Sequence, residues 1–372
     1  MKFSFIDETN QSFINNTNQK GEIYFAIIGN NPSGQTCHLD KNGTLIPCDV
    51  SDNDAEGHLT KNGQNWCNYF YTIKEVDEIE VPHIISGRAY ISLGSPMYLK
   101  ISHANTFIQP DTANPSDPNV DVYFDWLEFT IDDRGFHGNT TQVDQFGFPM
   151  VIELIATDGH PQEAGILKDR KRSDLFNKYT ETVPAEFQSL VQKPHDEKKA
   201  PFRIIAPFKG SFANGGNNAT YFDDYIGRMW RYYTANQLKL SIQEGTFIGK
   251  VENNIFTFTK ADSPDTKYTI NYPKSWEVFE CSGVFATGEA IQKAIQAQIS
   301  TMFNRHILEH PEKKCEPTEY YKEAPANYYA EFWHLHSINN KAYGFPFDDV
   351  CNQSTLLEHT VPQELKVTIR WD

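Results

Sequence analysis

The sequence predicts a mainly β fold, in which a β-sandwich or barrel domain is interrupted by a mixed α/β segment. Three observations lead to this prediction. Of the 372 residues, 13% are aromatic and 22% are charged, and Gly and Pro are spread along the chain, which is typical of strand-rich proteins with many turns. Short alternating runs fill the first part of the chain. Apolar residues at helical spacing appear within residues 184–330.

Residues 1–183 are expected to form the first part of the β domain. From Gly21 to Thr157 the apolar or alternating runs are 6 to 12 residues long and are separated by Gly, Pro, Asn and Asp. Such lengths and separators predict strands joined by turns. The runs are EIYFAIIG, GTLIPC, NYFYTI, RAYISLG, MYLKIS, VDVYFDWLEFTI and MVIELIAT.

Residues 184–330 are expected to form a mixed α/β domain. Helical spacing in YFDDYIGRMWRYYTANQL and GEAIQKAIQAQISTMFNRHIL predicts two helices, with Trp230 packed in the core. Between them, GTFIGKVENNIFTFTKADSPDTKYTINY alternates like two or three strands. Residues 331–372 return to strand character in QELKVTIRWD. This tail is expected to complete the first sheet, which makes the α/β segment an insertion.

Charge and hydropathy argue against two kinds of partner. The chain has 33 Lys and Arg against 49 Asp and Glu, a net charge of -16, whereas binding to nucleic acid requires a basic surface. No stretch approaches the roughly 20 apolar residues of a membrane-spanning helix. We therefore expect neither a nucleic acid nor a membrane as partner. Nothing about the length demands oligomerisation, so a monomer is expected.

No motif implies a metal or an organic cofactor. His334 and His336 share one face if EFWHLHS is a strand, and two histidines so placed can bind a metal. Because no Asp or Cys lies at a matching offset, ordinary hydrogen-bonded histidines are favoured. The glycine-rich GSFANGGNN loop lacks the Lys-Ser/Thr of a P-loop, and it is expected to be a flexible loop near the groove.

Cysteines and sequons favour an extracellular protein. The cysteines show no CxxC pair, and an even count favours disulfides, although six cysteines allow fifteen pairings and reduced thiols remain an alternative. Asn-x-Ser/Thr sites are also permissive of secretion. The first residues lack a signal-peptide core, so either the protein stays inside the cell or Met1 replaces a leader. The cysteines are Cys37, Cys48, Cys67, Cys281, Cys315 and Cys351.

A candidate site lies in the segment VDVYFDWLEFTIDDRGFHGNTTQVDQFGFPMVIEL. Turn residues divide it into two alternating runs, as expected of a hairpin with a longer loop. If that loop is centred near Phe136, Glu128 faces Asp144 on the opposite strand. Alternation gives an odd, core face and an even face that mixes aromatic rings with a carboxylate. The even face consists of Phe124, Trp126, Glu128 and Thr130.

This even face has the chemistry of a sugar-binding cleft. Flat rings such as that of Trp126 stack on pyranose faces, and polar groups bind hydroxyls. Two neighbouring carboxylates also push one pKa upwards, which supplies the protonated acid and the ionised base of glycoside hydrolysis. The alternative is a surface or structural carboxylate pair. A register slip of one residue would place the two on opposite faces.

The chain resembles glycoside hydrolase family 64, the laminaripentaose-producing β-1,3-glucanases, whose barrel domain in turn resembles thaumatin-like proteins. The resemblance rests on EIYFAIIG, NPSDPN, DWLEFTIDDRGFHGNTTQVDQFGFPMVIEL and YGFPFDDV. It implies a thaumatin-like barrel beside an inserted α/β domain, with a wide groove between them that holds the glucan. It also implies an inverting, endo-acting enzyme with Glu128 as general acid and Asp144 as general base. Inversion requires carboxyls roughly 6.5 to 9.5 Å apart.

The resemblance implies further substrate-binding positions. Asp117, Asp348 and Asp349 match acidic groove residues that hold hydroxyls and tune the acid, and Thr130 matches a sugar-contacting position. The alternative for Asp117 is a cap on a Pro-flanked turn. For Asp348 and Asp349, consecutive strand residues face opposite ways, so at least one is expected to point into the groove. Two departures from the family are Asp132, where Asn is usual, and His137, where an aromatic residue, often Trp, is usual.

The sequence therefore predicts a hydrolase of laminarin-type β-1,3-glucan that works without a cofactor. The alternative from another class is a non-catalytic thaumatin-like protein that binds glucan or acts against fungi. A third possibility is an intracellular structural or storage protein, which reduced cysteines would favour.

Overall fold

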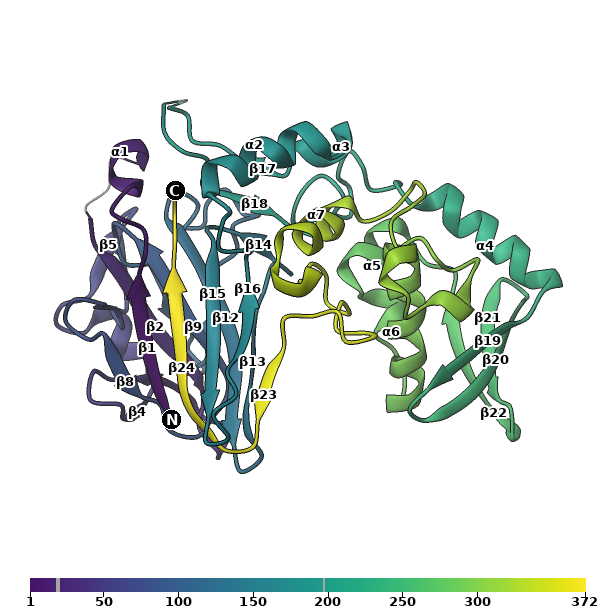
Figure 1. Ribbon diagram of the computed structural model, residues 1–372, viewed down its shortest axis with the longest axis horizontal. Coiled ribbons are helices and arrows are strands. Elements are labelled where there is room, and N and C mark those ends of the chain that lie inside the picture. Colours follow the sequence, from purple (N-terminus) through teal and green to yellow (C-terminus); the bar gives the residue numbers. More distant parts are fainter. Residues whose placement is uncertain (18–20, 197) are drawn as a thin grey trace.

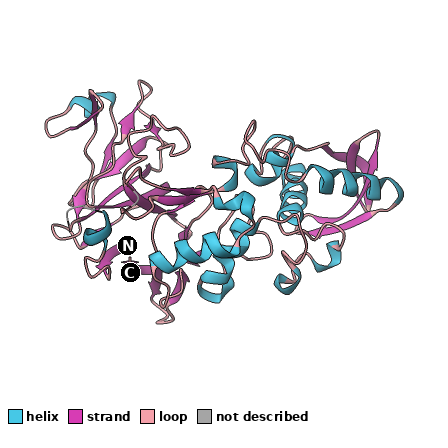
Figure 2. Cartoon of the chain, turned by 90° about the horizontal axis from the view of Figure 1, so that it is seen from above, coloured by secondary structure: helices cyan, strands magenta, loops and turns pink. Residues whose placement is uncertain are grey.

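Strands dominate one half of the molecule and helices gather in the other (Figures 1 and 2). The computed structural model describes residues 1–17, 21–196 and 198–372. Strand content exceeds helix content, as the composition predicted. In the half that is drawn on the left of Figure 1, two sheets face each other, which makes it a β-sandwich.

The larger sheet carries the candidate site. Its strand order is β23-β13-β12-β9-β2-β3-β4, and β7 pairs with β2. Its core strands are the runs that alternation predicted, among them EIYFAIIG, RAYISLG and VDVYFDWLEFTI. The strands are β2 (Ile23–Asn30), β3 (Thr36–Leu39), β4 (Leu45–Pro47), β7 (Tyr71–Thr72), β9 (Ile84–Leu93), β12 (Tyr123–Asp132), β13 (Gly135–Thr140) and β23 (Leu357–His359).

The smaller sheet brings the two ends of the chain together. Its order is β16-β15-β24-β1-β8, so the last strand lies between the first strand, to which it is parallel, and β15, to which it is antiparallel. The predicted return of QELKVTIRWD to the first domain is confirmed. The strands are β1 (Lys2–Asp7), β8 (Glu78–Glu80), β15 (Met150–Ala156), β16 (Gln162–Gly165) and β24 (Pro362–Ile369).

The sandwich core lies between these two sheets. Odd-numbered residues of β12, such as Leu127 and Phe129, meet Leu365 and Val367 of β24 in one buried cluster. The predicted core face of β12 is therefore confirmed. Asp125 is the polar exception on this face; its carboxylate accepts hydrogen bonds from the Gly147 and Trp126 backbone N–H groups. Burial raises the pKa of Asp125 to about 7.

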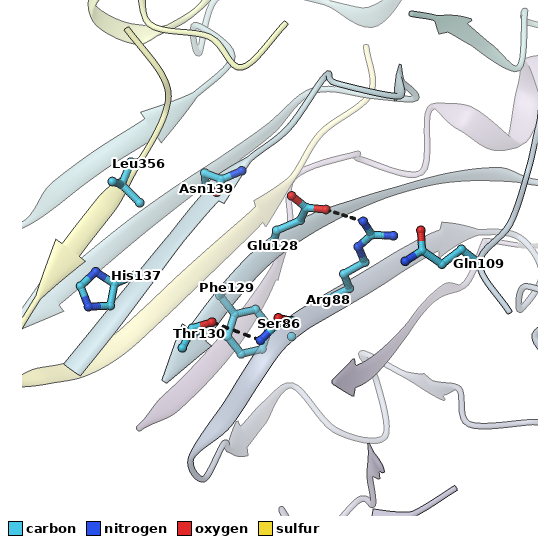
Figure 3. Close-up of a pocket in the computed structure, with 10 residues that line it drawn as sticks. Ser86, Arg88, Gln109, Glu128, Phe129, Thr130, His137, Asn139 and Leu356 are labelled. Atoms are coloured by element: carbon cyan, nitrogen blue, oxygen red, sulfur yellow. Dashed lines mark hydrogen bonds and ion pairs between the residues drawn. The ribbon is translucent and has the colours of Figure 1, made fainter. Parts of the chain in front are cut away.

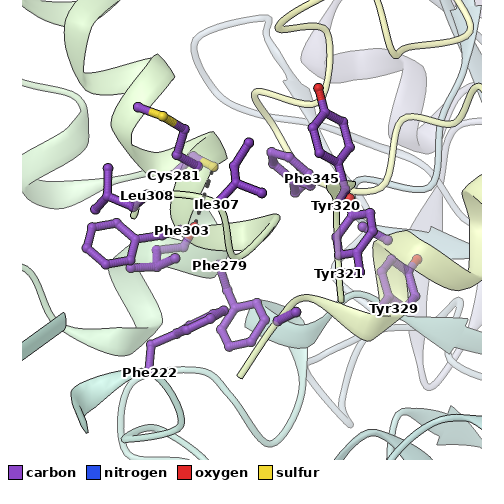
Figure 4. Close-up of a cluster of buried hydrophobic side chains, with 14 of the residues drawn as sticks. Phe222, Phe279, Cys281, Phe303, Ile307, Leu308, Tyr320, Tyr321, Tyr329 and Phe345 are labelled. Atoms are coloured by element: carbon purple, nitrogen blue, oxygen red, sulfur yellow. Dashed lines mark hydrogen bonds between the residues drawn. The ribbon is translucent and has the colours of Figure 1, made fainter. Parts of the chain in front are cut away.

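The mixed segment has its own core (Figure 4). Buried side chains recur every three or four residues on α4 (Asp223–Ala235) and α6 (Ala290–Asn304), which confirms the two predicted helices. Trp230 is buried there, as predicted. The alternating stretch forms a sheet of order β19-β20-β21-β22. Its strands are β19 (Leu238–Ile242), β20 (Gly245–Glu252), β21 (Ile255–Lys260) and β22 (Ser263–Asn271).

Three further helices pack around this second core. They are α2 (Arg172–Thr182), α5 (Ser275–Glu280) and α7 (Tyr328–His336). Because α2 and α7 contribute to it, the cluster runs from Phe146 to Phe345 and includes residues on both sides of the predicted boundaries at 183 and 330. The division into 1–183, 184–330 and 331–372 stays a prediction.

The strand interpretation of EFWHLHS is wrong, because this segment lies in α7. The Asn327 side chain caps the helix by accepting a hydrogen bond from the Ala330 N–H. Tyr329, Ala330 and Trp333 are buried at helical spacing. His334 and His336 are therefore on a helix, and the described residues contain no cluster of His, Cys, Asp or Glu that could hold a metal.

Short elements complete the chain. The shorter strands are β5 (Leu59–Lys61), β6 (Gln64–Trp66), β10 (Lys100–Ile101), β11 (Phe107–Ile108), β14 (Gln145–Phe146), β17 (Val191–Gln192) and β18 (Arg203–Ile205). The shorter helices are α1 (Phe13–Thr17) and α3 (Ala185–Gln188). The 3-10 helices are η1 (Val50–Asp54), η2 (Pro207–Lys209), η3 (Gly283–Phe285), η4 (Pro311–Lys313), η5 (Pro317–Glu319) and η6 (Ile338–Asn340).

Cysteine pairing is sparse. Cys315 and Cys351 form a disulfide, and the other four cysteines are free and buried. Burial raises the pKa of Cys48, Cys67 and Cys281 to about 12, which keeps these thiols protonated and unreactive. Among the described residues, no helix combines the length and the apolar character that crossing a membrane requires.

Candidate active site

A cavity of about 420 Å³ opens on the outer face of the larger sheet, away from the sandwich core (Figure 3). Glu128 points into it from β12 because even-numbered residues of that strand face away from the core. Glu128 lies opposite Arg88 of β9 on one side and Asn139 of β13 on the other. The lining residues are Ser86, Gly87, Arg88, Gln109, Glu128, Phe129, Thr130, His137, Asn139 and Leu356.

The predicted register of the hairpin is wrong. The β12–β13 turn closes at the pair Asp132–Gly135, so it is centred two to three residues before Phe136 and Glu128 pairs with Asn139, not Asp144. Gly135 allows this tight turn because its φ is +106°, and a Cβ at this position would lie 2.1 Å from the His359 carbonyl oxygen. Asp144 lies past the end of β13.

Asp144 is placed by the junction between the sandwich and the mixed segment. It immediately precedes β14, which pairs with β18. The Ala206 N–H donates a hydrogen bond of 2.9 Å to the Asp144 carbonyl. The Lys209 Nζ lies 3.3 Å from the Asp144 Oδ1. The mixed segment therefore supplies both a backbone contact and a cation to this carboxylate.

The two carboxylates nevertheless share one electrostatic neighbourhood. Arg88 Nη2 lies 2.7 Å from Glu128 Oε1 (Figure 3). Burial acts to lower the pKa of Arg88, but the charges of Tyr90, Glu128 and Asp144 raise it overall. Burial raises the pKa of Tyr90 to about 12, and both carboxylates contribute. The side chains of Glu128 and Asp144 are 32% and 30% exposed, so solvent reaches both.

Trp126 lies behind Glu128 and is not an open stacking platform. Its side chain is buried with Phe124 and Tyr90 in a small cluster on this face of the sheet. The indole Nε1 donates a hydrogen bond of 3.4 Å to Glu128 Oε1, and the Arg88 guanidinium lies 5.6 Å from the ring centre. The prediction that the Trp126 ring stacks on a sugar is therefore wrong; the ring supports the Glu128–Arg88 pair instead.

Asp348 does not reach the groove, contrary to the prediction. Its carboxylate is fully buried and contacts Arg305 at 2.9 Å, His334 at 3.0 Å and the Gly344 N–H at 3.0 Å. Burial alone would raise the pKa of Asp348, but His334 and Arg305 hold it below its ordinary value. FPFDDV forms a turn rather than a strand, so the alternating-face argument does not apply.

Asp349 follows in the same turn and is exposed. Burial raises the pKa of Tyr343, and the charges of Asp349 and Glu128 add to that shift. The Gln142 N–H donates to the Tyr343 carbonyl at 2.9 Å, which ties this loop to the strand that leads to Asp144.

Of the remaining predicted positions, two line the cavity and two do not. Thr130 Oγ1 accepts a hydrogen bond from the Ser86 N–H, and His137 Nδ1 lies 3.1 Å from Glu358 Oε2 (Figure 3). Asp132 is bonded to Arg134 at the hairpin tip, outside the cavity lining. Asp117 accepts hydrogen bonds from the Asp111 and Asn119 backbone N–H groups, which is the turn-capping alternative.

Sequence reasoning missed several residues of the site, above all Arg88, Gln109 and Lys209. Alternation along ISGRAYISLG places Arg88 on the same face as Ser86 and Tyr90, so a signal for Arg88 was present. No local sequence pattern indicates that Gln109 or Lys209 belongs to the site, because both lie in loops or turns. A second hollow of about 210 Å³ shares Ser86, Arg88 and Gln109 and extends the groove over β2 and β3.

The chain is similar to proteins of one known family. A model of the family described as Beta-1,3-glucanase matches residues 8–369. A β-1,3-glucanase domain from Clostridium beijerinckii is 38% identical and superposes with a TM-score of 0.91, covering 100% of this chain and 98% of that one. A laminaripentaose-producing β-1,3-glucanase from Paenibacillus barengoltzii, solved with laminarihexaose, is 34% identical with a TM-score of 0.78 over 100% of this chain and 75% of that one.

The chain is shorter than its curated relatives. A glucan endo-1,3-beta-glucosidase from Arthrobacter sp. (strain YCWD3) is 27% identical over 357 residues, which are 94% of this chain. The chain spans 63% of the length of that relative. The same coverage holds for the corresponding protein from Cellulosimicrobium cellulans.

Proposed function

The chain belongs to glycoside hydrolase family 64, the β-1,3-glucanases, and on that premise we propose that it cleaves β-1,3-glucan internally into short oligosaccharides. One observation carries the proposal. Glu128 lines the groove, and Asp144, from a different element, adds its charge to that of Glu128 in raising the pKa of Arg88 and of Tyr90. Both carboxylates are partly exposed. Glycoside hydrolysis by acid and base requires such a pair.

In the proposed reaction, Glu128 is the general acid and Asp144 the general base, and the configuration at the anomeric carbon is inverted. Asp144 takes a proton from a water molecule, whose oxygen forms a bond to the anomeric carbon. Glu128 gives its proton to the departing glycosidic oxygen as the bond to the anomeric carbon breaks. The acid regains a proton from solvent, to which its partly exposed side chain has access.

We assign binding roles from the cavity lining. Thr130, His137, Gln109 and Asn139 carry polar groups that can bind sugar hydroxyls along the groove. Asp349, exposed next to Tyr343, is proposed as a further contact. The Paenibacillus barengoltzii relative was solved with laminarihexaose, which supports a laminarin-type substrate for this chain.

The remaining features of the proposal concern the whole protein. We propose that the sandwich is a thaumatin-like domain and that the mixed segment is its insertion. An extracellular, monomeric enzyme is proposed, in keeping with a polymeric glucan as substrate. No cofactor is part of the proposed reaction.

Incubation with laminarin tests the proposal through the release of reducing ends. We expect Glu128→Gln and Asp144→Asn each to lower kcat by about 10² to 10⁴-fold. The exposed Asp265→Asn in β22 is the matched control and should keep full activity. Proton NMR of the first products should show the α-anomer, because inversion at the anomeric carbon converts a β linkage into an α-anomeric product.

Different failures of this experiment have different meanings. A protein that sediments with insoluble glucan but releases no reducing ends is the non-catalytic binder. Full activity in Glu128→Gln contradicts the assignment of the acid. A β-anomeric product contradicts inversion and leaves hydrolysis standing.

A further inference from the structure

We infer that Lys209 is the positioning residue for Asp144, so that the mixed segment completes the proposed active site of the sandwich. This inference rests on the proposed hydrolysis, in which Asp144 must be ionised and correctly oriented to activate water. Among the described residues, Lys209 is the one cation within ion-pair distance of the Asp144 carboxylate, at 3.3 Å.

The backbone around Lys209 is held to the backbone of Asp144. Strand β18 pairs with β14, through Gln145 opposite Ile205. The next residue after β18, Ala206, donates its N–H to the Asp144 carbonyl at 2.9 Å. The Lys209 N–H then bonds back to the Ala206 carbonyl at 3.0 Å, which closes the η2 turn. Two backbone hydrogen bonds, both through Ala206, thus link Lys209 to Asp144.

Partial burial strengthens this ion pair relative to one in open solvent. The Lys209 and Asp144 side chains are 31% and 30% exposed, and a less hydrated pair attracts more strongly. The ammonium group attracts the carboxylate through Oδ1, which lies 3.3 Å from Nζ. The second cation near Asp144 is Arg88, which contacts Glu128.

The two proposed carboxylates therefore have separate cation partners from separate parts of the molecule. Arg88 of β9 in the sandwich contacts Glu128, and Lys209 of η2 contacts Asp144. Other groups that interact electrostatically with Asp144 are Tyr90 of β9 and Tyr329 of α7. This division lets the acid and the base be oriented independently, although both add their charge at Arg88 and Tyr90.

The first test separates kcat from KM on laminarin for Lys209→Met and Lys209→Arg. Because Lys209 is proposed to orient the base and not to bind the glucan, Lys209→Met should lower kcat by about 10 to 100-fold and leave KM unchanged. Lys209→Arg keeps the charge and should recover most of kcat. The exposed Lys239→Met on β19 removes the same charge elsewhere and should leave both constants unchanged.

The second test does not depend on activity. A crystal structure of Lys209→Met should show the Asp144 carboxylate turned to a different direction from that in the parent protein, and Lys209→Arg should restore the parent direction. If the parent does not hydrolyse laminarin, the proposed function fails and this comparison still decides the role of Lys209. Lys209→Gln serves as the second neutral variant if Lys209→Met folds poorly.

Three outcomes would overturn the inference. One is an Asp144 carboxylate that keeps its parent direction in Lys209→Met. Another is an unchanged kcat with only KM raised, because Lys209 then binds substrate instead of holding the base. The third is an equal loss of kcat in Lys239→Met, which would show an effect of net charge alone.

Discussion

At the scale of single residues, two neighbouring side chains contact the Glu128 carboxylate. Arg88 contacts Glu128 Oε1 at 2.7 Å, and the Trp126 indole N–H donates to the same oxygen. The Arg88 guanidinium is itself held by the Tyr90 hydroxyl at 3.4 Å. Together these contacts fix the direction of Glu128 in the cavity.

These contacts predict the effect of Arg88→Met. Removing the guanidinium takes away the 2.7 Å contact that orients the Glu128 carboxylate, so kcat on laminarin should fall by about 10 to 100-fold. Arg88→Lys keeps a charge and should lose less activity. An unchanged kcat in Arg88→Met would contradict the role of Arg88 in orienting the acid.

At the scale of elements, the turn that contains FPFDDV is built around a buried charge cluster. The Asp348 carboxylate, with no exposed surface, contacts Arg305, His334 and the Gly344 N–H. The same turn region carries Tyr343, whose pKa is raised by burial and by the charges of Asp349 and Glu128, and whose carbonyl accepts a hydrogen bond from the Gln142 N–H. Asp348 thus holds together the turn that carries Tyr343.

Asp348→Asn should lower the free energy of unfolding by about 3 to 5 kcal/mol at pH 7, because it leaves the Arg305 charge buried without a partner. The pKa of Asp348 in the folded state lies below its ordinary value. Its stabilisation is therefore present above the ordinary carboxyl pKa and is lost as the pH falls. Urea unfolding at several pH values should show the gap between the two proteins narrowing towards acid. The exposed Asp349→Asn is the control; a gap that stays constant with pH would contradict the argument.

At the scale of the whole molecule, the groove residues depend on two separate hydrophobic cores. The sandwich core joins both sheets, and the second core joins α2, α4, α6, α7 and the β19–β22 sheet. The strand β24 closes the sandwich between β1 and β15, so the last residues of the chain are central to the first core. Glu128 belongs to the sandwich, whereas Lys209 belongs to the junction.

Leu365→Ala should therefore destabilise the sandwich by about 2 to 5 kcal/mol, because it leaves a cavity beside the buried side chains of β24. Calorimetry should show a lower midpoint temperature for the unfolding of the sandwich. The midpoint temperature for the mixed segment should stay the same. Lys366→Ala, on the opposite face of the same strand, should have a small effect. One transition that moves as a whole would mean that the two cores unfold together.

Much of the fold followed from periodicity. Alternation predicted β2, β9, β12, β15 and β24, and helical spacing predicted α4 and α6. The helix α7 was missed because its short aromatic stretch is also typical of a strand. The predicted hairpin register was wrong, because the turn closes at Gly135 and is not centred on Phe136. The numbers of paired residues therefore sum to five less than predicted. A tight turn and a longer loop have the same turn-forming residues, and local sequence does not choose between them.

The sequence by itself determined which strand carries Glu128, which face of that strand lies away from the core, and which family the chain resembles. These follow from side-chain direction and local spacing, which act over a few residues. Only the tertiary structure decided that Asp144 joins the site through β18, that Asp348 is buried and that Trp126 supports Glu128 from behind. Those outcomes depend on contacts such as Ala206 to Asp144 and Arg305 to Asp348, which are separated by 62 and 43 residues along the chain. Hydrogen bonds and ion pairs over such separations form only when packing has brought the distant segments together.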